Sequence, residues 1–176
     1  MKIIKSKIKN AFIIDPTIHS DNRGSFMELY KVGQLTNFKI CQINQAISKK
    51  KCIRGLHFQK KPFQQAKLVW VPEGEVLDII VDLNPKSETY LLHDYFKLSS
   101  SNNRMLFVPK GCAHGYITKT NKVVFNYALD EIYNPKFDAG VNFFDSKINI
   151  KLDFDVSQYE LSKKDETLPF LKDITL

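Results

Sequence analysis

The stretch RGLHFQKKPFQQAKLVWV, residues 54–71, is rich in apolar residues at both ends and polar in its middle. This pattern predicts two β segments joined by a loop, as in a hairpin. Yet the segments also carry Arg54, His57 and Lys67 among their apolar residues. Such groups indicate a solvated sheet edge, metal ligands or an acid–base site inside a barrel.

Short β-type segments separated by turn residues recur along the rest of the chain. Turn signals include DNRG at 21–24, PEGE at 72–75 and PKG at 109–111. A helix is predicted only near residues 32–37 and after Ser157. So many short strands predict an all-β fold, a sandwich or a jelly roll, with a few short helices at its periphery. The predicted strands cover residues 12–14, 25–30, 40–46, 67–71, 75–82, 95–98, 105–108, 116–118 and 123–129.

The period-two alternation of a β-strand tells which side chains share a face. In residues 123–129, Tyr127 falls on the same face as Val123, Phe125 and Leu129. In residues 67–71, Lys67 shares a face with two valines. Because burying an unpaired ammonium is costly, this lysine is expected at the mouth of a cavity or at an edge.

The size and charge of the chain limit the classes of function that fit it. A length of 176 residues with 43% hydrophobic residues predicts one globular domain. The net charge of +7 allows an anionic ligand, but it also fits a lysine-rich solvated surface. The basic residues are scattered and form no recognition-helix pattern, so we expect no nucleic acid partner.

The cysteines and the N-terminus bear on the cellular location. Three cysteines without a CxxC pair predict free thiols in a reducing cytoplasm. Lysines interrupt the apolar residues of MKIIKSKIKNAFII at 1–14, so no signal peptide is expected. No apolar run approaches the ~20 residues of a membrane-spanning helix, and no membrane partner is predicted.

The stretch PKGCAH at 109–114 matches P-x-G-x-x-H, the second motif of the cupins, and so supports the jelly roll. Metal-binding cupins usually also carry an H-x-H pair and a glutamate in their first motif. Here the corresponding residues are His57, Phe58 and Gln59, and no glutamate follows before Glu73. Two histidines without the other ligands make a poor Zn²⁺ or Fe²⁺ site, so no metal is expected.

A series of motifs, taken together and in order, makes the chain similar to the dTDP-4-dehydrorhamnose 3,5-epimerase family of the cupin superfamily. The resemblance covers about the whole chain and implies one cupin-like epimerase domain over residues 1–176. It also implies a homodimer in which an N-terminal segment of about residues 1–30 is exchanged. The motifs are DNRGSFMELY at 21–30, QINQ at 42–45, RGLHFQ at 54–59, AKLVWVPEGEVLDIIVDL at 66–83, LFVPKGCAHGY at 106–116, FNYALDEIYNP at 125–135 and LSKKD at 161–165.

The reaction of this family gives a reason for several residue types. A 4-keto sugar has acidic protons at C3 and C5, because the ketone delocalises the carbanion as an enolate. Epimerisation needs a base on one face of the ring and a proton donor on the other. His57 suits the base and Tyr127 the opposite acid, while Lys67 suits the stabilisation of the enolate. No cofactor is required.

The resemblance also places a carboxylate, Asp165, beside His57 as its orienting acceptor. Two interpretations of this residue stay open at the level of sequence. Ser162 followed three residues later by Asp165 is equally typical of a capping box at a helix start.

The remaining matches concern binding of a nucleotide-linked sugar. Arg54 offers a bidentate fork for a diphosphate. The N-terminal motif supplies Arg23, Phe26 and Glu28, although DNRG is also a good surface turn. The other predicted substrate-binding residues are Gln42, Asn44, His114, Tyr133 and Asp138.

The chain departs from the family in its last third. Asp138 stands where a glutamate is usual, and the segment VNFFDSKINIKL at 141–152 lacks the tryptophans common there. The expected activity is inversion at C3, C5 or both of a 4-keto-6-deoxyhexose linked to a nucleotide, with dTDP favoured. It would serve deoxysugar and surface polysaccharide biosynthesis. The alternatives are a single-centre epimerase, a 3,4-ketoisomerase, or a cupin that binds sugar or metal without catalysis.

Overall fold

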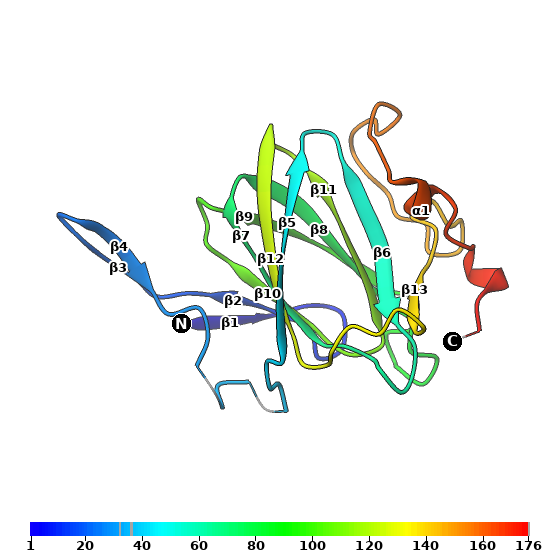
Figure 1. The fold of residues 1–176 in the computed structure, drawn as a ribbon, viewed down its shortest axis with the longest axis horizontal. Helices are drawn as coiled ribbons and strands as arrows, with labels where there is room; N and C mark the ends of the chain where they lie inside the picture. Colours follow the sequence, from blue (N-terminus) through cyan, green and yellow to red (C-terminus); the bar gives the residue numbers. More distant parts are fainter. Residues whose placement is uncertain (32, 36, 176) are drawn as a thin grey trace.

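Two antiparallel β-sheets packed face to face make up most of the computed structural model, which describes every residue except 32, 36 and 176 (Figure 1). The first sheet has the strand order β1 (Lys2–Lys5), β2 (Phe12–Asp15), β10 (Met105–Val108), β7 (Lys67–Glu73), β12 (Lys122–Leu129) and β5 (Gln42–Lys49). The second has the order β13 (Asp138–Gly140), β6 (Ile53–Gln59), β11 (Cys112–Thr118), β8 (Glu75–Asp82) and β9 (His93–Ser99). The fold is the predicted all-β jelly roll.

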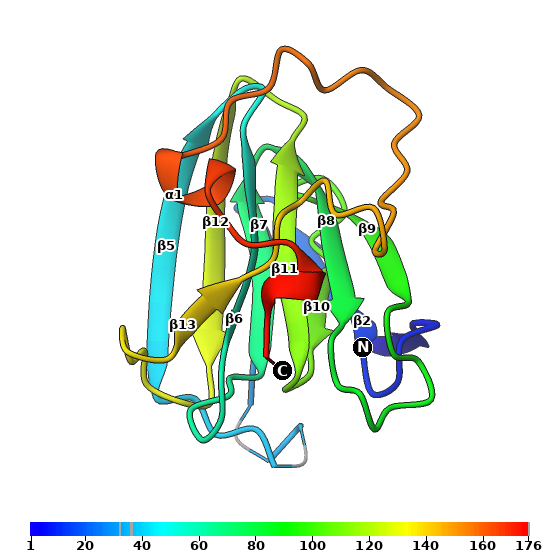
Figure 2. The ribbon, with the colours of Figure 1, turned by 90° about the vertical axis from the view of Figure 1, so that its right-hand side faces the viewer.

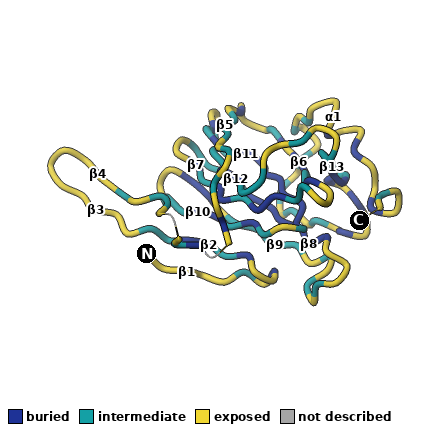
Figure 3. The backbone as a smooth tube through the Cα atoms, turned by 60° about the horizontal axis from the view of Figure 1, so that its bottom comes forward, coloured by how far each residue is buried: buried dark blue, intermediate teal, exposed yellow. Residues whose placement is uncertain are grey.

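The main core lies between the two sheets. Val69, Val123 and Phe125 of the first sheet pack in one cluster with Val76 and Ile80 of the second. Tyr127 is partly buried against the same cluster, as the alternation of its strand predicts. Figure 3 shows the buried backbone concentrated in the sandwich, whereas its ends and loops are exposed.

The predicted hairpin of residues 54–71 is wrong. The strand β6 pairs with β11 and β13, whereas β7 pairs with β10 and β12 in the opposite sheet. The polar residues between the two strands therefore form a crossing from one sheet to the other. An apolar–polar–apolar pattern identifies both strands but not the partner of either, because strand partners are chosen by tertiary packing. Consequently His57 and Lys67 lie on opposite sheets, and their side chains face the interior between the sheets.

The C-terminal part of the chain, from residue 141 onward, runs over the outer face of the five-stranded sheet (Figure 2). Val141, Phe143 and Ile148 are buried there against residues of β6, β8 and β11. The segment contains the short helix α1 (Lys163–Glu166) and the 3-10 turn η1 (Leu171–Asp173). The helix predicted after Ser157 is thus confirmed. In the other predicted helix, Val32 and Thr36 lie outside the described residues, and residues 33–35 and 37 form turns and bends.

The hairpin of β3 (Ile18–Asp21) and β4 (Gly24–Met27) projects from the sandwich at the N-terminal side (Figure 1). Its strands are almost wholly exposed. The predicted strand at 25–30 therefore ends early, at Met27. Among the described residues, no helix is both long and apolar enough to cross a membrane.

Candidate active site

A cavity of about 520 Å³ opens between the two sheets and is lined by side chains of both. The five-stranded sheet contributes His57 and Arg54 from β6, and His114 from β11. The six-stranded sheet contributes Lys67 from β7 and Tyr127 from β12. His57 and Tyr127 thus line one cavity from opposite walls. Lys67 borders it too, which is the first of the two positions expected for it, the mouth of a cavity rather than a sheet edge.

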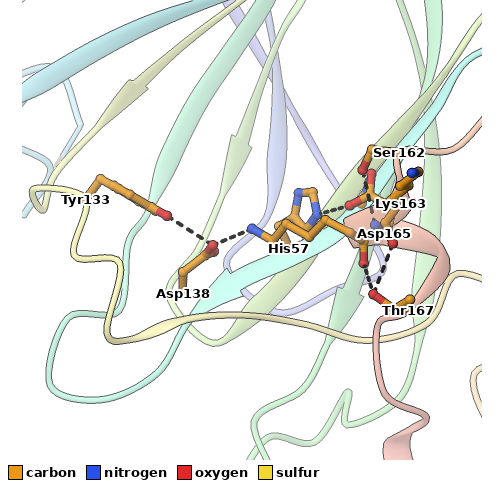
Figure 4. Close-up of polar contacts among 9 residues, drawn as sticks. His57, Tyr133, Asp138, Ser162, Lys163, Asp165 and Thr167 are labelled. Atoms are coloured by element: carbon orange, nitrogen blue, oxygen red, sulfur yellow. Dashed lines mark hydrogen bonds and ion pairs between the residues drawn. The ribbon is translucent and has the colours of Figure 1, made fainter.

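His57 is held by a carboxylate from the C-terminal helix. Its Nε2 lies 2.6 Å from Asp165 Oδ1 (Figure 4). The His57 side chain remains 32% exposed, whereas that of Asp165 is only 4% exposed. Burial would raise the pKa of Asp165, but the hydrogen bond and charge of His57, with further hydrogen bonds from Gly55 and Ser162, hold it below its usual value.

Asp165 has the contacts that both interpretations require, a hydrogen bond to His57 and a place in the capped first turn of α1. Ser162 is the N-cap of α1, and its hydroxyl accepts a hydrogen bond of 3.1 Å from the backbone N–H of Asp165. The cap begins the helix at this point, and the carboxylate of Asp165 lies within hydrogen-bond distance of His57 (Figure 4). The backbone N–H of Gly55 also lies near this carboxylate, at 3.4 Å from Oδ2. The helix start therefore serves to place the carboxylate.

A second histidine–aspartate pair lies beside the first. His114 is the cross-strand partner of His57, and its Nε2 lies 2.9 and 3.0 Å from the two oxygens of Asp78. Its side chain is 7% exposed and that of Asp78 is fully buried. His114 lines the cavity, as a sugar-contacting residue would. Asp78 lies behind it and was not predicted.

Close approach of β6 and β11 at this point depends on Gly55. Its φ is +107°, a conformation that side chains rarely adopt. A Cβ there would lie 2.7 Å from the backbone oxygen of His114. The glycine in RGLH therefore allows the two imidazoles to sit on neighbouring strands.

Lys67 is partly buried in the cavity wall and has negative charges nearby. Burial lowers the pKa of Lys67 to about 8, and the charges of Asp78 and Asp138 oppose this lowering. At neutral pH the amine is still protonated, since its pKa lies above 7. The cavity therefore holds a cation in an environment where charge is poorly screened.

Arg54 stands at the rim of the cavity and is oriented by hydroxyl groups. Its Nε donates a 2.9 Å hydrogen bond to Ser48 Oγ, which lies 3.0 Å from the hydroxyl of Tyr116. Ser48 and Tyr116 are both buried, and the ring of Tyr116 stacks on Phe125 with 4.2 Å between centroids. The arginine is exposed and can meet an anion.

The other side of the rim carries Tyr133 and Asp138. The Tyr133 hydroxyl donates to Asp138 Oδ2 at 3.1 Å (Figure 4), and the Lys164 ammonium pairs with the same oxygen. Asn44 also lines the cavity, and its Oδ1 accepts a 3.0 Å hydrogen bond from Gln42 Nε2. Gln42 and Asn44 thus face the same way, as predicted from their spacing of two.

Gln42 bonds to Asn44 and to the backbone of Tyr133 without lining the cavity itself, and three further predicted binding residues lie away from the cavity. Arg23 is in the turn between β3 and β4, with its side chain 86% exposed and paired to Asp21. Phe26 and Glu28 are exposed on the same projecting arm. Within a single chain they do not meet the other site residues. A role for them at a substrate site requires a second subunit and stays a prediction.

Sequence reasoning missed Asp78, Tyr116 and Lys164 as members of the site. A signal for Asp78 was present, because alternation in VLDIIVD at 76–82 puts it on the inward face with Val76 and Ile80. A lone acid on such a face indicates a buried partner. Lys164 carries no such signal, since it belongs to a polar, exposed run.

Metal ligands do not gather at the site. In the part of the chain that the structure describes, no three His, Cys, Asp or Glu side chains are grouped so as to hold a metal ion. Each cavity histidine instead engages a carboxylate through its Nε2. These pairs suit proton transfer and substrate positioning. The expectation that catalysis needs no metal stays a prediction.

Comparison with known proteins places this cavity in a family. Residues 5–173 match the family model for dTDP-4-dehydrorhamnose 3,5-epimerase. The dTDP-4-dehydrorhamnose 3,5-epimerase of Methanothermobacter thermautotrophicus is 36% identical over 170 residues, covering 93% of this chain and 91% of the relative.

Solved structures agree with the sequence matches. The crystal structure of dTDP-4-dehydrorhamnose 3,5-epimerase from Elizabethkingia anophelis NUHP1 has a TM-score of 0.93 and 38% identity, covering 98% of this chain and 97% of that one. An epimerase from Legionella pneumophila Philadelphia 1, solved in complex with dTDP-4-keto-L-rhamnose, has a TM-score of 0.93 and 32% identity, with coverage of 99% and 94%. The chain therefore belongs to the dTDP-4-dehydrorhamnose 3,5-epimerase family.

Proposed function

We propose that the cavity epimerises a nucleotide-linked 4-keto-6-deoxyhexose, with His57 as base and Tyr127 as acid. Membership of the family makes the protein an isomerase of the nucleotide-sugar epimerase class, which acts in deoxysugar biosynthesis. One observation carries the assignment of roles. His57, already oriented by Asp165, and Tyr127 line the same cavity from opposite sheets. Inversion of a carbon needs a base and an acid placed in this way.

The proton steps follow from the hydrogen bonds. An ionised carboxylate can only accept, so Asp165 draws the N–H tautomer to Nε2 of His57 and leaves the lone pair on Nδ1. Nδ1 takes the proton from the carbon next to the ketone. The electron pair of that C–H bond moves onto the ketone oxygen, forming an enolate. Tyr127 then gives its phenolic proton to the opposite face of the carbon, and solvent restores both groups.

Lys67 supplies the electrostatic part of the reaction. The enolate oxygen gains negative charge that the ketone lacks, so a fixed ammonium stabilises the transition state more than the ground state. The partly buried position of Lys67 strengthens this effect, because protein surroundings screen a charge less than bulk water does. The carboxylate of Asp165 acts separately by stabilising the imidazolium of His57 after proton removal.

The nucleotide is held at the rim in this proposal. Arg54 offers its guanidinium to the diphosphate, Tyr133 packs against the base, and Gln42, Asn44 and Asp138 add polar contacts. His114 contacts the sugar from the wall. The favoured nucleotide is dTDP, because the Legionella pneumophila relative was solved with a dTDP-linked keto sugar.

Assembly and location belong to the same proposal. Arg23, Phe26 and Glu28 reach a cavity only if the projecting arm enters a second subunit, so the working enzyme is a homodimer with exchanged arms over about residues 1–30. The three cysteines are free thiols, which suits a cytoplasmic enzyme.

The direct experiment follows solvent deuterium into a dTDP-4-keto-6-deoxyhexose by NMR. The expected result is exchange at C3, C5 or both with inversion, and unchanged rates after exhaustive chelation. Exchange at one centre alone identifies a single-centre epimerase. If the protein binds the sugar but exchanges nothing, the chain is a binding cupin and the proposal fails. Activity lost on chelation and restored by Zn²⁺, Fe²⁺ or Mn²⁺ would remove the metal-free mechanism.

A further inference from the structure

The loop at residues 131–134, which carries Tyr133 to the rim of the cavity, is held by glutamine side chains. Gln65 Nε2 donates to the backbone oxygen of Glu131 at 2.9 Å. Gln42 Oε1 accepts from the backbone N–H of Tyr133 at 2.9 Å. Backbone groups of the loop therefore make hydrogen bonds with glutamine side chains rather than with a neighbouring strand.

Gln59 makes the most contacts with this loop. Its Oε1 accepts from the N–H of Asn134 at 2.7 Å, and its Nε2 lies 3.4 Å from the oxygen of Ile132. The same Nε2 donates to the oxygen of Phe63 at 2.7 Å, which ties the loop to the crossing between β6 and β7. One amide thus joins two loops at the mouth of the cavity.

The three glutamines start from separate parts of the fold. Gln42 begins β5, Gln59 ends β6, and Gln65 lies in the crossing before β7. Gln59 and Gln65 are only 4% and 9% exposed. Buried amides that satisfy backbone groups are costly to remove, because the partner groups are then left without water or protein. The loop is consequently fixed from two sheets.

Tyr133 needs such support because little else packs on it. Its side chain is 47% exposed, and its hydroxyl is tied to Asp138. A ring in this position can stack on a flat ligand only if its backbone is already placed. Binding energy would otherwise be spent on ordering the loop.

We propose that Gln59 and Gln65 are positioning residues that preorganise Tyr133 for the base of the bound nucleotide. The inference rests on the proposed function, which gives Tyr133 its ligand. Neither glutamine takes part in proton transfer. Their loss therefore weakens nucleotide binding and raises KM more than it lowers kcat.

The test is a double-mutant cycle with dTDP as the probe. Gln59→Met and Gln65→Met keep chain length and remove the amide, and each should weaken dTDP binding by roughly 5- to 30-fold in calorimetry. In a Tyr133→Ala background the same changes should weaken it by no more than about twofold, because the ring they position is gone. Gln64→Met is the matched control, since Gln64 neighbours Gln65 but does not bond the loop in the described structure.

The outcomes separate this inference from the proposed function. If the unmodified protein does not bind dTDP, both fail. A second outcome is that the unmodified protein binds dTDP and exchanges solvent deuterium, while both glutamine variants bind dTDP as tightly as Gln64→Met does. In that case only the positioning role of Gln59 and Gln65 is wrong. An equal loss in the two backgrounds would also overturn the inference, because the glutamines would then not act through Tyr133. If Gln59→Met does not fold, Gln65→Met alone tests the inference.

Discussion

Two histidine–aspartate pairs lie side by side in the cavity wall and differ in how far they open to it. His57 is about one-third exposed, at 32%, and only its partner Asp165 is buried. In the other pair both members are buried, and the two oxygens of Asp78 share one nitrogen of His114. The two histidines are cross-strand partners, so they lie at the same level of the sheet. Their position along the strands therefore does not explain why their exposure differs.

The contrast comes from where each carboxylate originates. Asp78 lies on β8, within the sheet itself, and closes the back of His114. Asp165 arrives from α1, the helix in the C-terminal segment whose first residues line the cavity, and His57 remains partly open. A base must reach substrate and solvent, whereas a positioning group need not. We therefore propose that the open pair transfers protons and that the closed pair holds the cavity wall.

The largest expected effect comes from removing the open imidazole. His57→Asn should lower the rate of solvent exchange by roughly 10²–10⁴, because a positioned general base contributes that much. His114→Asn should lower it less and raise KM more. Exchange rates and KM for both folded variants decide the comparison. Near wild-type exchange in His57→Asn would contradict the assignment.

Lys67→Met should lower the rate by roughly 10²-fold, the usual consequence of losing one group that stabilises a developing oxyanion. Wild-type kcat should also fall as pH rises through about 8, where the amine loses its charge. A plot of kcat against pH shows whether the alkaline limb disappears in Lys67→Met. Persistence of the limb would assign it to another group.

The same lysine should make stability rise with pH, whereas it makes kcat fall. Its pKa is lowered from 10.5 to about 8 in the folded protein, so between these values the unfolded chain binds more protons. The contribution of Lys67 to the free energy of unfolding therefore increases with pH across this window. Urea titrations of wild type and Lys67→Met along the window measure it. A contribution that decreases would mean that the folded pKa is raised.

Replacing the carboxylate partners of the two histidines should have different effects on activity and stability. Asp165→Asn should lower exchange by about 10- to 100-fold and should cost less stability than Asp78→Asn, because its partner His57 stays partly open to water and the Ser162 cap remains. Asp78→Asn removes the charge from a buried pair and should cost about 1–3 kcal/mol of stability. Exchange rates and denaturant titrations on both variants test the contrast. Equal profiles for the two would show that the pairs have one role.

The smallest effect concerns the cap that places Asp165. Ser162→Ala should destabilise the protein by about 1 kcal/mol or less, the usual value of an N-cap. It should also lower the exchange rate modestly, since the helix start places the carboxylate. Ser157→Ala, at an exposed turn before α1, serves as the control. A rate unchanged in Ser162→Ala would show that Asp165 is placed by its contact with His57 alone.

Local sequence patterns predicted those parts of the fold that bury a continuous face. The bounds of β8 and β10 agree with the sequence prediction, because both strands are strongly apolar. The strands β1 and β3 were missed, since all their residues are exposed and carry no alternation. The hairpin of 54–71 was wrong because pairing across sheets is not encoded in either strand alone.

Local sequence patterns also predicted part of the candidate site. Period-two alternation placed Tyr127 on the apolar face of its strand and Lys67 at the mouth of a cavity or at an edge, and the structure puts both at the cavity. Asp165 came from a resemblance, and its own segment suggested only a helix cap. The contacts of Gln59 with two loops depend on groups far along the chain. Such tertiary hydrogen bonds leave no periodic trace in the sequence.

The central claim, that His57 and Tyr127 act from opposite faces of the sugar, is tested most directly by Tyr127→Phe. This change keeps the ring and deletes the hydroxyl, so packing in the cavity wall should hardly alter. NMR in deuterated solvent reports exchange and configuration of the sugar together. The expected result is that deuterium still enters the substrate while inversion is largely lost, because the enolate is reprotonated on the face of His57. Inverted product formed at an undiminished rate would contradict it.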